Sequence, residues 1–179
     1  MLRVEIGPGP SKLAQDWTTV SSVPGDAVDL LAEWGMDPLP FLDGTVDEIY
    51  ASHVIEHVPW FLAPCALVDA WRVLRRGGRI ELHTIDFCAV ATAYGSGDAS
   101  DPGDPVFADF MGSINFRIFA RPVHYRDGAD AMLHRSCYDE RYLRMLLGGA
   151  GFVDVSRVAE PRGPEKHGRW NLGVSAVKA

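Results

Sequence analysis

The sequence predicts an α/β fold with a doubly wound, mostly parallel sheet that ends in an antiparallel edge strand. Three observations predict it. Short apolar segments alternate with segments of helical periodicity, a glycine loop follows the first apolar segment, and two strand-like segments close the chain. Alternation of strands and helices is typical of parallel sheets, and ligands of such sheets bind at the carboxyl ends of the strands.

The first half of the chain contains three segments that we expect to be strands. Residues 2–6 are short and apolar, residues 17–20 are rich in β-branched side chains, and residues 46–52 are expected to form the next strand. Prolines and glycines interrupt residues 22–45, so this stretch is predicted as loop, with a short strand near residues 28–31.

The stretch from residue 59 onward is expected to hold the helices. Residues 59–75 have apolar side chains at helical spacing, and Gly77-Gly78 is expected to end this helix as a C-cap. The remaining elements are predicted as a strand at 79–85, helices at 87–94 and 138–147, and strands at 152–158 and 172–177.

Composition excludes several classes of protein. The formal net charge is -7 with a pI near 5.3, whereas nucleic-acid binding would favour a basic excess. No run of 18 or more apolar residues predicts a membrane span, and the N-terminus shows no signal-peptide pattern. The three cysteines form no close pair, and Cys65 and Cys88 lie in apolar runs, where we expect them in the core. We therefore expect a reduced, cytoplasmic protein.

Two motifs stand at the carboxyl ends of predicted strands. The first is Val4-Glu5-Ile6-Gly7-Pro8-Gly9, and the second runs from Asp37-Pro38-Leu39-Pro40-Phe41 through residues 46–58, ending in Ser52-His53-Val54-Ile55-Glu56-His57-Val58. In this order and at this separation they resemble the class I S-adenosylmethionine-dependent methyltransferases, including a small group of predicted methyltransferases. The resemblance implies a Rossmann-like fold.

The resemblance also implies how S-adenosylmethionine would be bound. The glycine loop would cradle the amino-acid end of the cofactor with Glu5 supporting the loop, and the segment from Asp37 would contact the adenine. The cofactor-binding residues expected on this basis are Glu5, Gly7, Pro8, Gly9, Ser21, Ser22, Asp37, Pro38, Leu39, Ser52, His53 and His57.

Two departures from the family pattern stand out. The second strand ends in Ser21 and Ser22, where the family carries a carboxylate for the ribose hydroxyls. The cofactor is therefore expected to bind more weakly, or its ribose to be held by Ser22, Asp26 or Asp29. The sequence also shows no cap helices before the first strand. The active site would then be open, or covered by the insertion at 95–132 or by a second subunit, which predicts a homodimer.

Methyl transfer to oxygen needs a base, because a protonated hydroxyl is a poor nucleophile. His53 is expected nearest the transferred methyl, and His134, Asp86 and His124 are further candidates. His53 and His57 have a spacing that also suits a metal, but no third ligand is evident, so no metal is expected.

We read residues 1–179 as a single methyltransferase-like domain, with residues 95–132 as a cover that binds the acceptor. The expected activity is methyl transfer to a small molecule, most simply a hydroxyl of a sugar or natural product. One alternative is an inactive methyltransferase-like scaffold or partner subunit. Another is a Rossmann-like enzyme using a nicotinamide or nucleotide sugar, which the missing third glycine and missing carboxylate disfavour.

Overall fold

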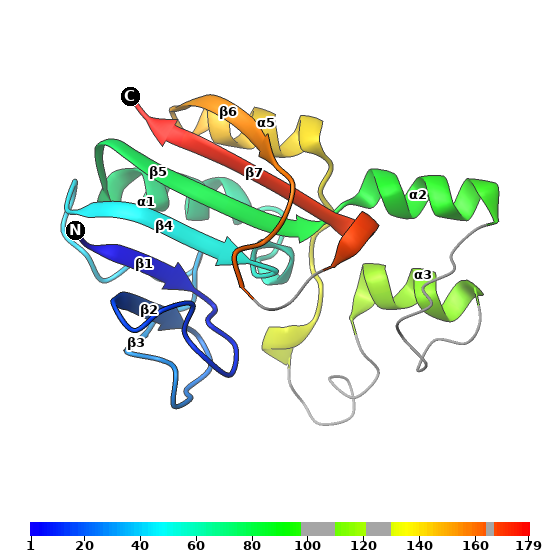
Figure 1. Cartoon of the computed structure of the whole chain (residues 1–179), viewed down its shortest axis with the longest axis horizontal. Helices are drawn as coiled ribbons and strands as arrows, with labels where there is room; N and C mark the ends of the chain where they lie inside the picture. The colour runs from blue at the N-terminus through cyan, green and yellow to red at the C-terminus, as the bar shows by residue number, and fades with distance from the viewer. Residues whose placement is uncertain (98–109, 121–129, 164–166) are drawn as a thin grey trace.

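A computed structural model describes residues 1–97, 110–120, 130–163 and 167–179 of the chain. Its centre is a seven-stranded sheet with the order β3-β2-β1-β4-β5-β7-β6 (Figure 1). The strands are β1 (Arg3–Ile6), β2 (Trp17–Ser21), β3 (Leu30–Leu31), β4 (Val46–Ser52), β5 (Leu74–Ile85), β6 (Phe152–Val158) and β7 (Asn171–Lys178). Strands β1 to β5 pair in parallel, so the predicted fold class is confirmed.

The prediction of an antiparallel edge strand needs one correction. The antiparallel strand is β7, and it lies between β5 and the edge strand β6. Several helices lie between β5 and β6 in the chain, and β7 then returns antiparallel into the space between these two strands. The sheet therefore ends in a strand that runs with β5.

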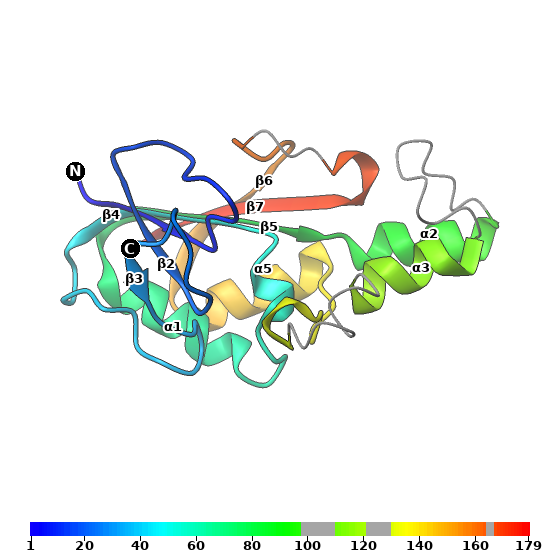
Figure 2. The ribbon, with the colours of Figure 1, turned by 90° about the horizontal axis from the view of Figure 1, so that it is seen from below.

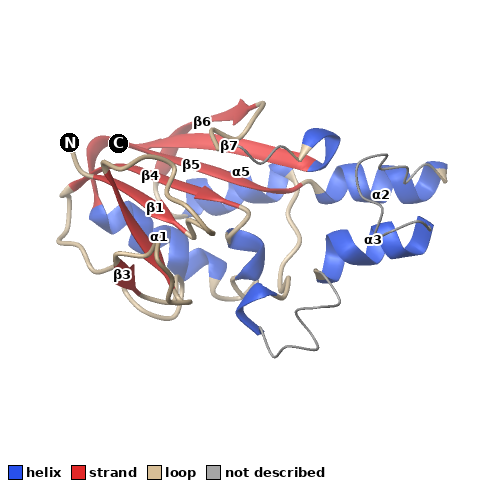
Figure 3. Ribbon diagram, turned by 60° about the horizontal axis from the view of Figure 1, so that its bottom comes forward, coloured by secondary structure: helices blue, strands red, loops and turns tan. Residues whose placement is uncertain are grey.

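Two helices cover one face of the sheet. Helix α1 (Ala63–Val73) joins β4 to β5, and α5 (Glu140–Gly149) precedes β6 (Figures 2 and 3). Asp139 caps α5 by accepting a hydrogen bond from Tyr142 N at 2.7 Å. Apolar side chains from both helices and the facing strands form one core, which includes Val4, Ile49, Leu67, Leu82, Leu143, Leu147 and Val174.

Helices α2 (Phe87–Ser96) and α3 (Phe110–Phe119) lie beyond the end of the sheet (Figure 1). Val90 and Ala93 of α2 pack with Ile114 of α3 and with Trp170. Three short 3-10 helices complete the described elements: η1 (Ile55–His57), η2 (Asp130–Met132) and η3 (Gly168–Trp170). No helix within the described ranges is long and apolar enough to span a membrane.

The predicted C-cap of α1 is wrong. The helix ends at Val73, and Leu74 is already extended as the first residue of β5. Gly77 lies inside β5 with φ +70°, and a Cβ on Gly78 would stand 2.8 Å from the carbonyl oxygen of Arg75. The two glycines therefore allow a tight bend within the strand.

The cysteines also differ from expectation. Cys65 and Cys88 are exposed, as is Cys137. In α1 the buried positions are Ala63, Ala66 and residues at helical spacing from them, so the apolar run continues onto the solvent side of the helix.

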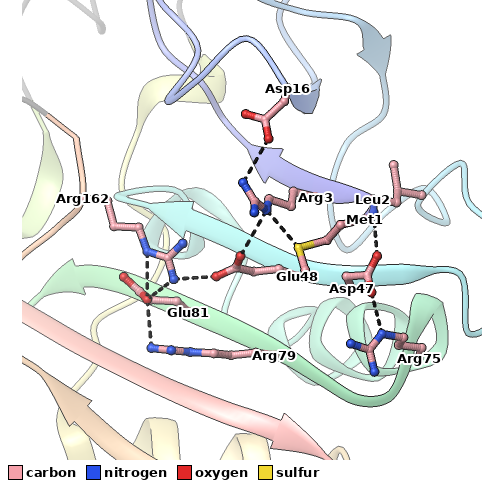
Figure 4. A network of polar contacts seen from close by, with 10 residues as sticks. All are labelled: Met1, Leu2, Arg3, Asp16, Asp47, Glu48, Arg75, Arg79, Glu81 and Arg162. Carbon is pink, nitrogen blue, oxygen red and sulfur yellow. Dashed lines mark hydrogen bonds and ion pairs between the residues drawn. The ribbon is translucent and has the colours of Figure 1, made fainter.

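The face of the sheet opposite α1 and α5 is polar. Residues 1–62, all of them described, contain no α-helix, whereas parallel sheets are normally covered by helices on both faces. Here Arg3, Glu48 and Glu81 project from β1, β4 and β5 and form ion pairs with their neighbours (Figure 4). Trp17 and Tyr50 on the same face are buried beneath the guanidinium of Arg162. Ion pairs and aromatic rings thus take the place of helices on this face.

Candidate cofactor and acceptor site

The loop after β1 offers backbone to a ligand. Gly7 and Gly9 have φ of +70° and +62°, a region that glycine enters without cost. A Cβ on Gly7 would stand 2.4 Å from Cγ2 of Val54, so only glycine fits there. Above Gly9 no atom lies within 4 Å of the corresponding position. The loop is therefore held tightly at Gly7 and open at Gly9.

Glu5 closes the base of this loop. Its side chain is buried, and its carboxylate accepts a hydrogen bond from Leu13 N at 2.7 Å. Burial raises the pKa of Glu5, while the Leu13 bond and the charge of Lys12 oppose that rise. The carboxylate thus fixes residues 7–13 as a closed turn at the end of β1.

At the end of β2 one nearby carboxylate, that of Asp29, is already engaged. Asp29 accepts from Lys12 Nζ at 2.6 Å and from Thr19 N at 2.9 Å. These hydrogen bonds from Lys12 and Thr19 lower the pKa of Asp29 to about 2. Ser21 Oγ accepts from Val23 N, and Ser22 is exposed. The structure therefore brings serines to the place of the ribose contact, while Asp29 is engaged and Asp26 is exposed in the turn before β3.

The segment predicted to contact adenine forms a tight turn after β3. Asp37 accepts from Glu33 N at 2.9 Å, and Leu39, only 2% exposed, anchors the end of the turn. Glu33 itself follows β3 closely and is exposed, a residue that the sequence analysis did not single out. Its position just beyond β3 could have drawn attention to it. Glu33 and Asp37 are thus two neighbouring acidic residues at this edge.

His53 follows β4 directly after Ser52, and its backbone is strained. Its φ is +54°, which is uncommon for a residue other than glycine. Its Nδ1 lies 2.9 Å from Oε1 of Glu56, a side chain that is 2% exposed. Burial alone would raise the pKa of Glu56, but contact with His53 and the charge of His57 lower it to about 2. An ionised carboxylate is therefore buried directly beside His53.

Two further predicted histidines lie on the other side of Glu56. His57 Nδ1 lies 3.1 Å from the carbonyl oxygen of Leu133, and His134 Nδ1 lies 3.1 Å from that of Arg117. Their ring centroids are 5.1 Å apart. Burial lowers the pKa of His134, so its ring is held neutral. The structure thus gathers His53, His57 and His134 around one carboxylate.

His167 belongs to the same cluster and was missed from the sequence. Its ring stacks on that of His53 with the centroids 3.5 Å apart. Burial lowers the pKa of His167 to about 4. No motif surrounds His167, because it lies on the connection between β6 and β7 that folds back over the end of β4.

The other two base candidates do not join this cluster as described. Asp86 caps α2 by accepting from Cys88 N at 3.0 Å, and its second oxygen lies 3.1 Å from Arg157. Both oxygens are thereby committed, which favours a structural role for Asp86. His124 lies outside the described residues. Within those residues no group of three or more His, Cys, Asp or Glu side chains is arranged to hold a metal ion.

Comparison with known families bears on the first part of the chain. Residues 2–82, which carry both motifs and strands β1 to β4, match the family model described as a methyltransferase domain. Over these residues the chain is similar to the methyltransferase family. The class I S-adenosylmethionine-dependent methyltransferase recognised from the sequence is thereby confirmed, together with its enzyme class and cofactor.

Solved methyltransferase structures share the fold over the whole chain. A SAM-dependent methyltransferase from Archaeoglobus fulgidus matches with a TM-score of 0.62 and 14% identity, covering 99% of this chain and 86% of the other. A possible histamine N-methyltransferase from Thermotoga maritima gives 0.57 and 17%, covering 99% and 82%. The 1,6-didemethyltoxoflavin-N1-methyltransferase of Burkholderia thailandensis, bound to S-adenosylhomocysteine, gives 0.57 and 19%, covering 99% and 71%. No curated protein matches the sequence.

The methyltransferase fold explains why these residues lie together. The strand order reverses between β1 and β4, and ligands of open α/β sheets bind outside the carboxyl ends of the strands at such a point. The open backbone at Gly9 fits a loop that receives a ligand. His53 and Glu56, which follow β4, face the same end of the sheet.

Proposed function

We propose that this methyltransferase methylates a hydroxyl of a small molecule, such as a sugar or a natural product. One observation carries the proposal. The open glycine loop after β1 and the histidine cluster around Glu56 lie at the ends of two adjacent strands. A methyl donor on one side and a proton acceptor on the other are what transfer to oxygen requires.

On the cofactor side, backbone does most of the binding. Gly7, Pro8 and Gly9 would hold the amino-acid end of S-adenosylmethionine, and Glu5 keeps their loop closed. Asp37, Pro38 and Leu39 would border the adenine, with Ser21 and Ser22 at the ribose and Ser52, His53 and His57 closing the pocket. The cofactor supplies a methyl group activated by a sulfonium.

On the acceptor side, neutral imidazoles favour an oxygen nucleophile. Burial lowers the pKa values of His134 and His167, which favours their unprotonated rings and leaves each ring a nitrogen lone pair. Net charge of -7 disfavours nucleic acid as the acceptor. The Burkholderia thailandensis neighbour is a methyltransferase of a small molecule, which supports an acceptor of that size. Residues 95–132 are proposed to cover it, although most of them lie outside the described ranges.

One observation favours a second candidate, a scaffold that binds the cofactor poorly. The Asp29 carboxylate is held by Lys12 and Thr19, and the strand end offers only Ser21 and Ser22 to the ribose. Neutral hydroxyls make weaker hydrogen bonds than a carboxylate does. A chain of this kind would act through a partner rather than through catalysis.

Calorimetric titration with S-adenosylhomocysteine separates the two candidates. Micromolar binding supports the enzyme, and no binding at millimolar ligand supports the scaffold. Asp37→Asn keeps the acceptor for Glu33 N but removes the charge, whereas Asp37→Ala removes both. If Asp37 contacts the adenine amino group through its charge, both variants bind weakly. If only the turn matters, Asp37→Asn binds like the wild type.

We further propose that the protein is a cytoplasmic homodimer. Within the described residues the polar face carries no helix, which leaves room for a second subunit. Light scattering measures the mass directly, and a monomer at micromolar concentration would rule the dimer out.

A further inference from the structure

We propose that Glu56 and His53 form a carboxylate–imidazole dyad in which His53 Nε2 removes the acceptor proton, with His167 as its cover. The proposal deepens the methyltransferase activity proposed above and rests on it. It assigns a role to Glu56 and to His167, neither of which was among the candidates from the sequence.

Glu56 is fixed from several sides. Its second carboxylate oxygen accepts from Thr84 Oγ1 at 3.0 Å. Its backbone oxygen accepts from the backbone amides of Arg135 and Ser136 at 2.7 and 3.1 Å. The remaining oxygen, Oε1, lies 2.9 Å from His53 Nδ1 as an ion-pair contact and has no hydrogen bond among the described residues. The proposal places a proton on Nδ1, facing a carboxylate that can only accept, so that Nε2 keeps its lone pair.

Nε2 of His53 is buried and has no hydrogen-bond partner among the described residues. A buried polar atom without a partner is costly, because it has lost its hydrogen bonds to water. The left-handed backbone at His53 adds a further cost. Strain and unsatisfied polar atoms of this kind concentrate at functional sites. A residue with a purely structural role would gain nothing from either cost.

His134 is the competing base, and its surroundings are less suitable. Its Nδ1 faces the neutral carbonyl of Arg117, not a carboxylate. The imidazolium formed when a base takes a proton is stabilised by an adjacent negative charge. Glu56 supplies that charge at 2.9 Å from His53, so the geometry favours His53 as the proton acceptor.

His167 shields the dyad. Its ring stacks on His53 at 3.5 Å from the opposite side of the sheet end. The charged and titratable groups that face His53 and His167 are Glu56, His57, His83, His134 and Arg117. Because His167 stays neutral above its lowered pKa of about 4, it covers His53 without adding a positive charge. The cover must shift for an acceptor to reach Nε2.

The proposed step balances. The acceptor hydroxyl gives its proton to His53 Nε2 as its oxygen bonds to the methyl carbon. The carbon–sulfur bond breaks, and its electron pair stays on sulfur. His53 holds the proton as an imidazolium beside Glu56 and then releases it to solvent.

The first test needs neither cofactor nor acceptor. Ring-nitrogen NMR of the histidine-labelled protein at neutral pH reports which nitrogen carries the proton. We expect His53 to carry it on Nδ1 in the wild type. In Glu56→Gln the amide oxygen keeps the bond from Thr84 and the amide nitrogen faces Nδ1, so the proton should move to Nε2. A wild-type proton on Nε2, or an unchanged tautomer in Glu56→Gln, overturns the dyad.

The second test measures the reactivity of Nε2 with diethyl pyrocarbonate, read by mass spectrometry of the His53 peptide. Glu56→Gln should slow acylation of His53 by about tenfold or more, because Nε2 loses its lone pair. His167→Ala should accelerate it by removing the cover. The matched control is Glu160→Gln at an exposed position, which should react like the wild type. Equal rates in the wild type and Glu56→Gln contradict the proposal.

Binding of S-adenosylhomocysteine to the same variants separates this proposal from the proposed function. We expect Glu56→Gln to bind it within about threefold of the wild type, since the dyad faces the acceptor. If the wild type does not bind, the proposed function fails, while NMR and acylation still decide the dyad. If Glu56→Gln alone loses binding, Glu56 serves the cofactor pocket and the dyad is wrong.

Discussion

Arg162 Nη2 lies 2.7 Å from Oε2 of Glu81 and fastens the connection between β6 and β7 onto the polar face of the sheet (Figure 4). The same guanidinium lies 5.8 Å from the ring centroid of Trp17 and 5.5 Å from that of Tyr50. Pairing with Glu81 and Glu48 raises the pKa of Arg162, although burial opposes the rise. The Arg162 side chain thus contacts residues of β2, β4 and β5 on the polar face.

Replacing this side chain should destabilise the fold. Arg162→Met should lower the free energy of unfolding by about 2 kcal/mol, because Glu81 at 2% exposure loses a buried counter-charge and keeps only Arg79 and His83. Urea denaturation measures the change. Arg76→Met, at an exposed arginine, should change stability by no more than about 0.5 kcal/mol. Equal effects at both positions would mean that the Arg162–Glu81 pair contributes no more to the free energy of unfolding than an exposed arginine does.

The glycine loop gives a sharper prediction. Gly7→Ala should cost about 2–4 kcal/mol, because its Cβ meets Val54 Cγ2 at 2.4 Å and its φ is +70°. In a Val54→Ala background the clash disappears, and the same substitution should cost only about 1–2 kcal/mol for the left-handed backbone. A double-mutant cycle by chemical denaturation gives both terms. If the cost is the same in both backgrounds, steric contact with Val54 is not its cause.

The histidine cluster predicts an acid-side loss of stability. The pKa of His167 is lowered to about 4 in the folded state, so as pH falls below about 6.5 the unfolded chain takes up the proton first. Stability contributed by the neutral ring is therefore lost between about pH 6.5 and 4. His134 shifts in the same direction. Denaturation midpoints across this range should fall, and His167→Gln should reduce the fall by on the order of 1 kcal/mol. A pH dependence identical in the two proteins would contradict the shifted pKa of His167.

The cap of α5 makes a local prediction. Asp139→Ala removes the acceptor for Tyr142 N and should cost about 1 kcal/mol, a fall of about 2–4 °C in Tm for a chain of this size. Asp139→Asn keeps an acceptor and should lose only a few tenths of a kcal/mol. Thermal melts of the three proteins at low salt provide the comparison. If the Asn variant is as unstable as the Ala variant, the charge of Asp139, and not its capping hydrogen bond, stabilises the helix.

Local patterns in the sequence predicted the sheet well. Strands β1, β2, β4, β6 and β7 lie within one or two residues of their predicted ranges because each is a short apolar run bounded by glycine or loop. The end of α1 was not predictable in this way. The backbone after Val73 becomes extended to pair Leu74 with Val46, an interaction between residues distant in sequence. Tertiary pairing overrode the helical period there.

The site residues likewise fall into two groups, those that a local sequence pattern predicts and those that only tertiary contacts bring into the site. The glycine loop, Glu5 and the histidines after β4 belong to one continuous pattern each, so the sequence identified them. His167 carries no such pattern, since only the return of the chain from β6 to β7 brings it onto His53. Asp86 was placed correctly at a strand end, but capping of α2 and pairing with Arg157 depend on contacts that the sequence does not display.

The polar face also bears on how this small methyltransferase could change over time. A helix inserted after β1 or β2 would need an apolar surface to rest on, but the strands present Arg3, Glu48 and Glu81 there. Placing such a helix on this face would require replacing several paired charges at once, and each single replacement would leave a partner without its counter-charge. The charges that allow the sheet to do without helices on this face therefore also disfavour the stepwise addition of a helix there.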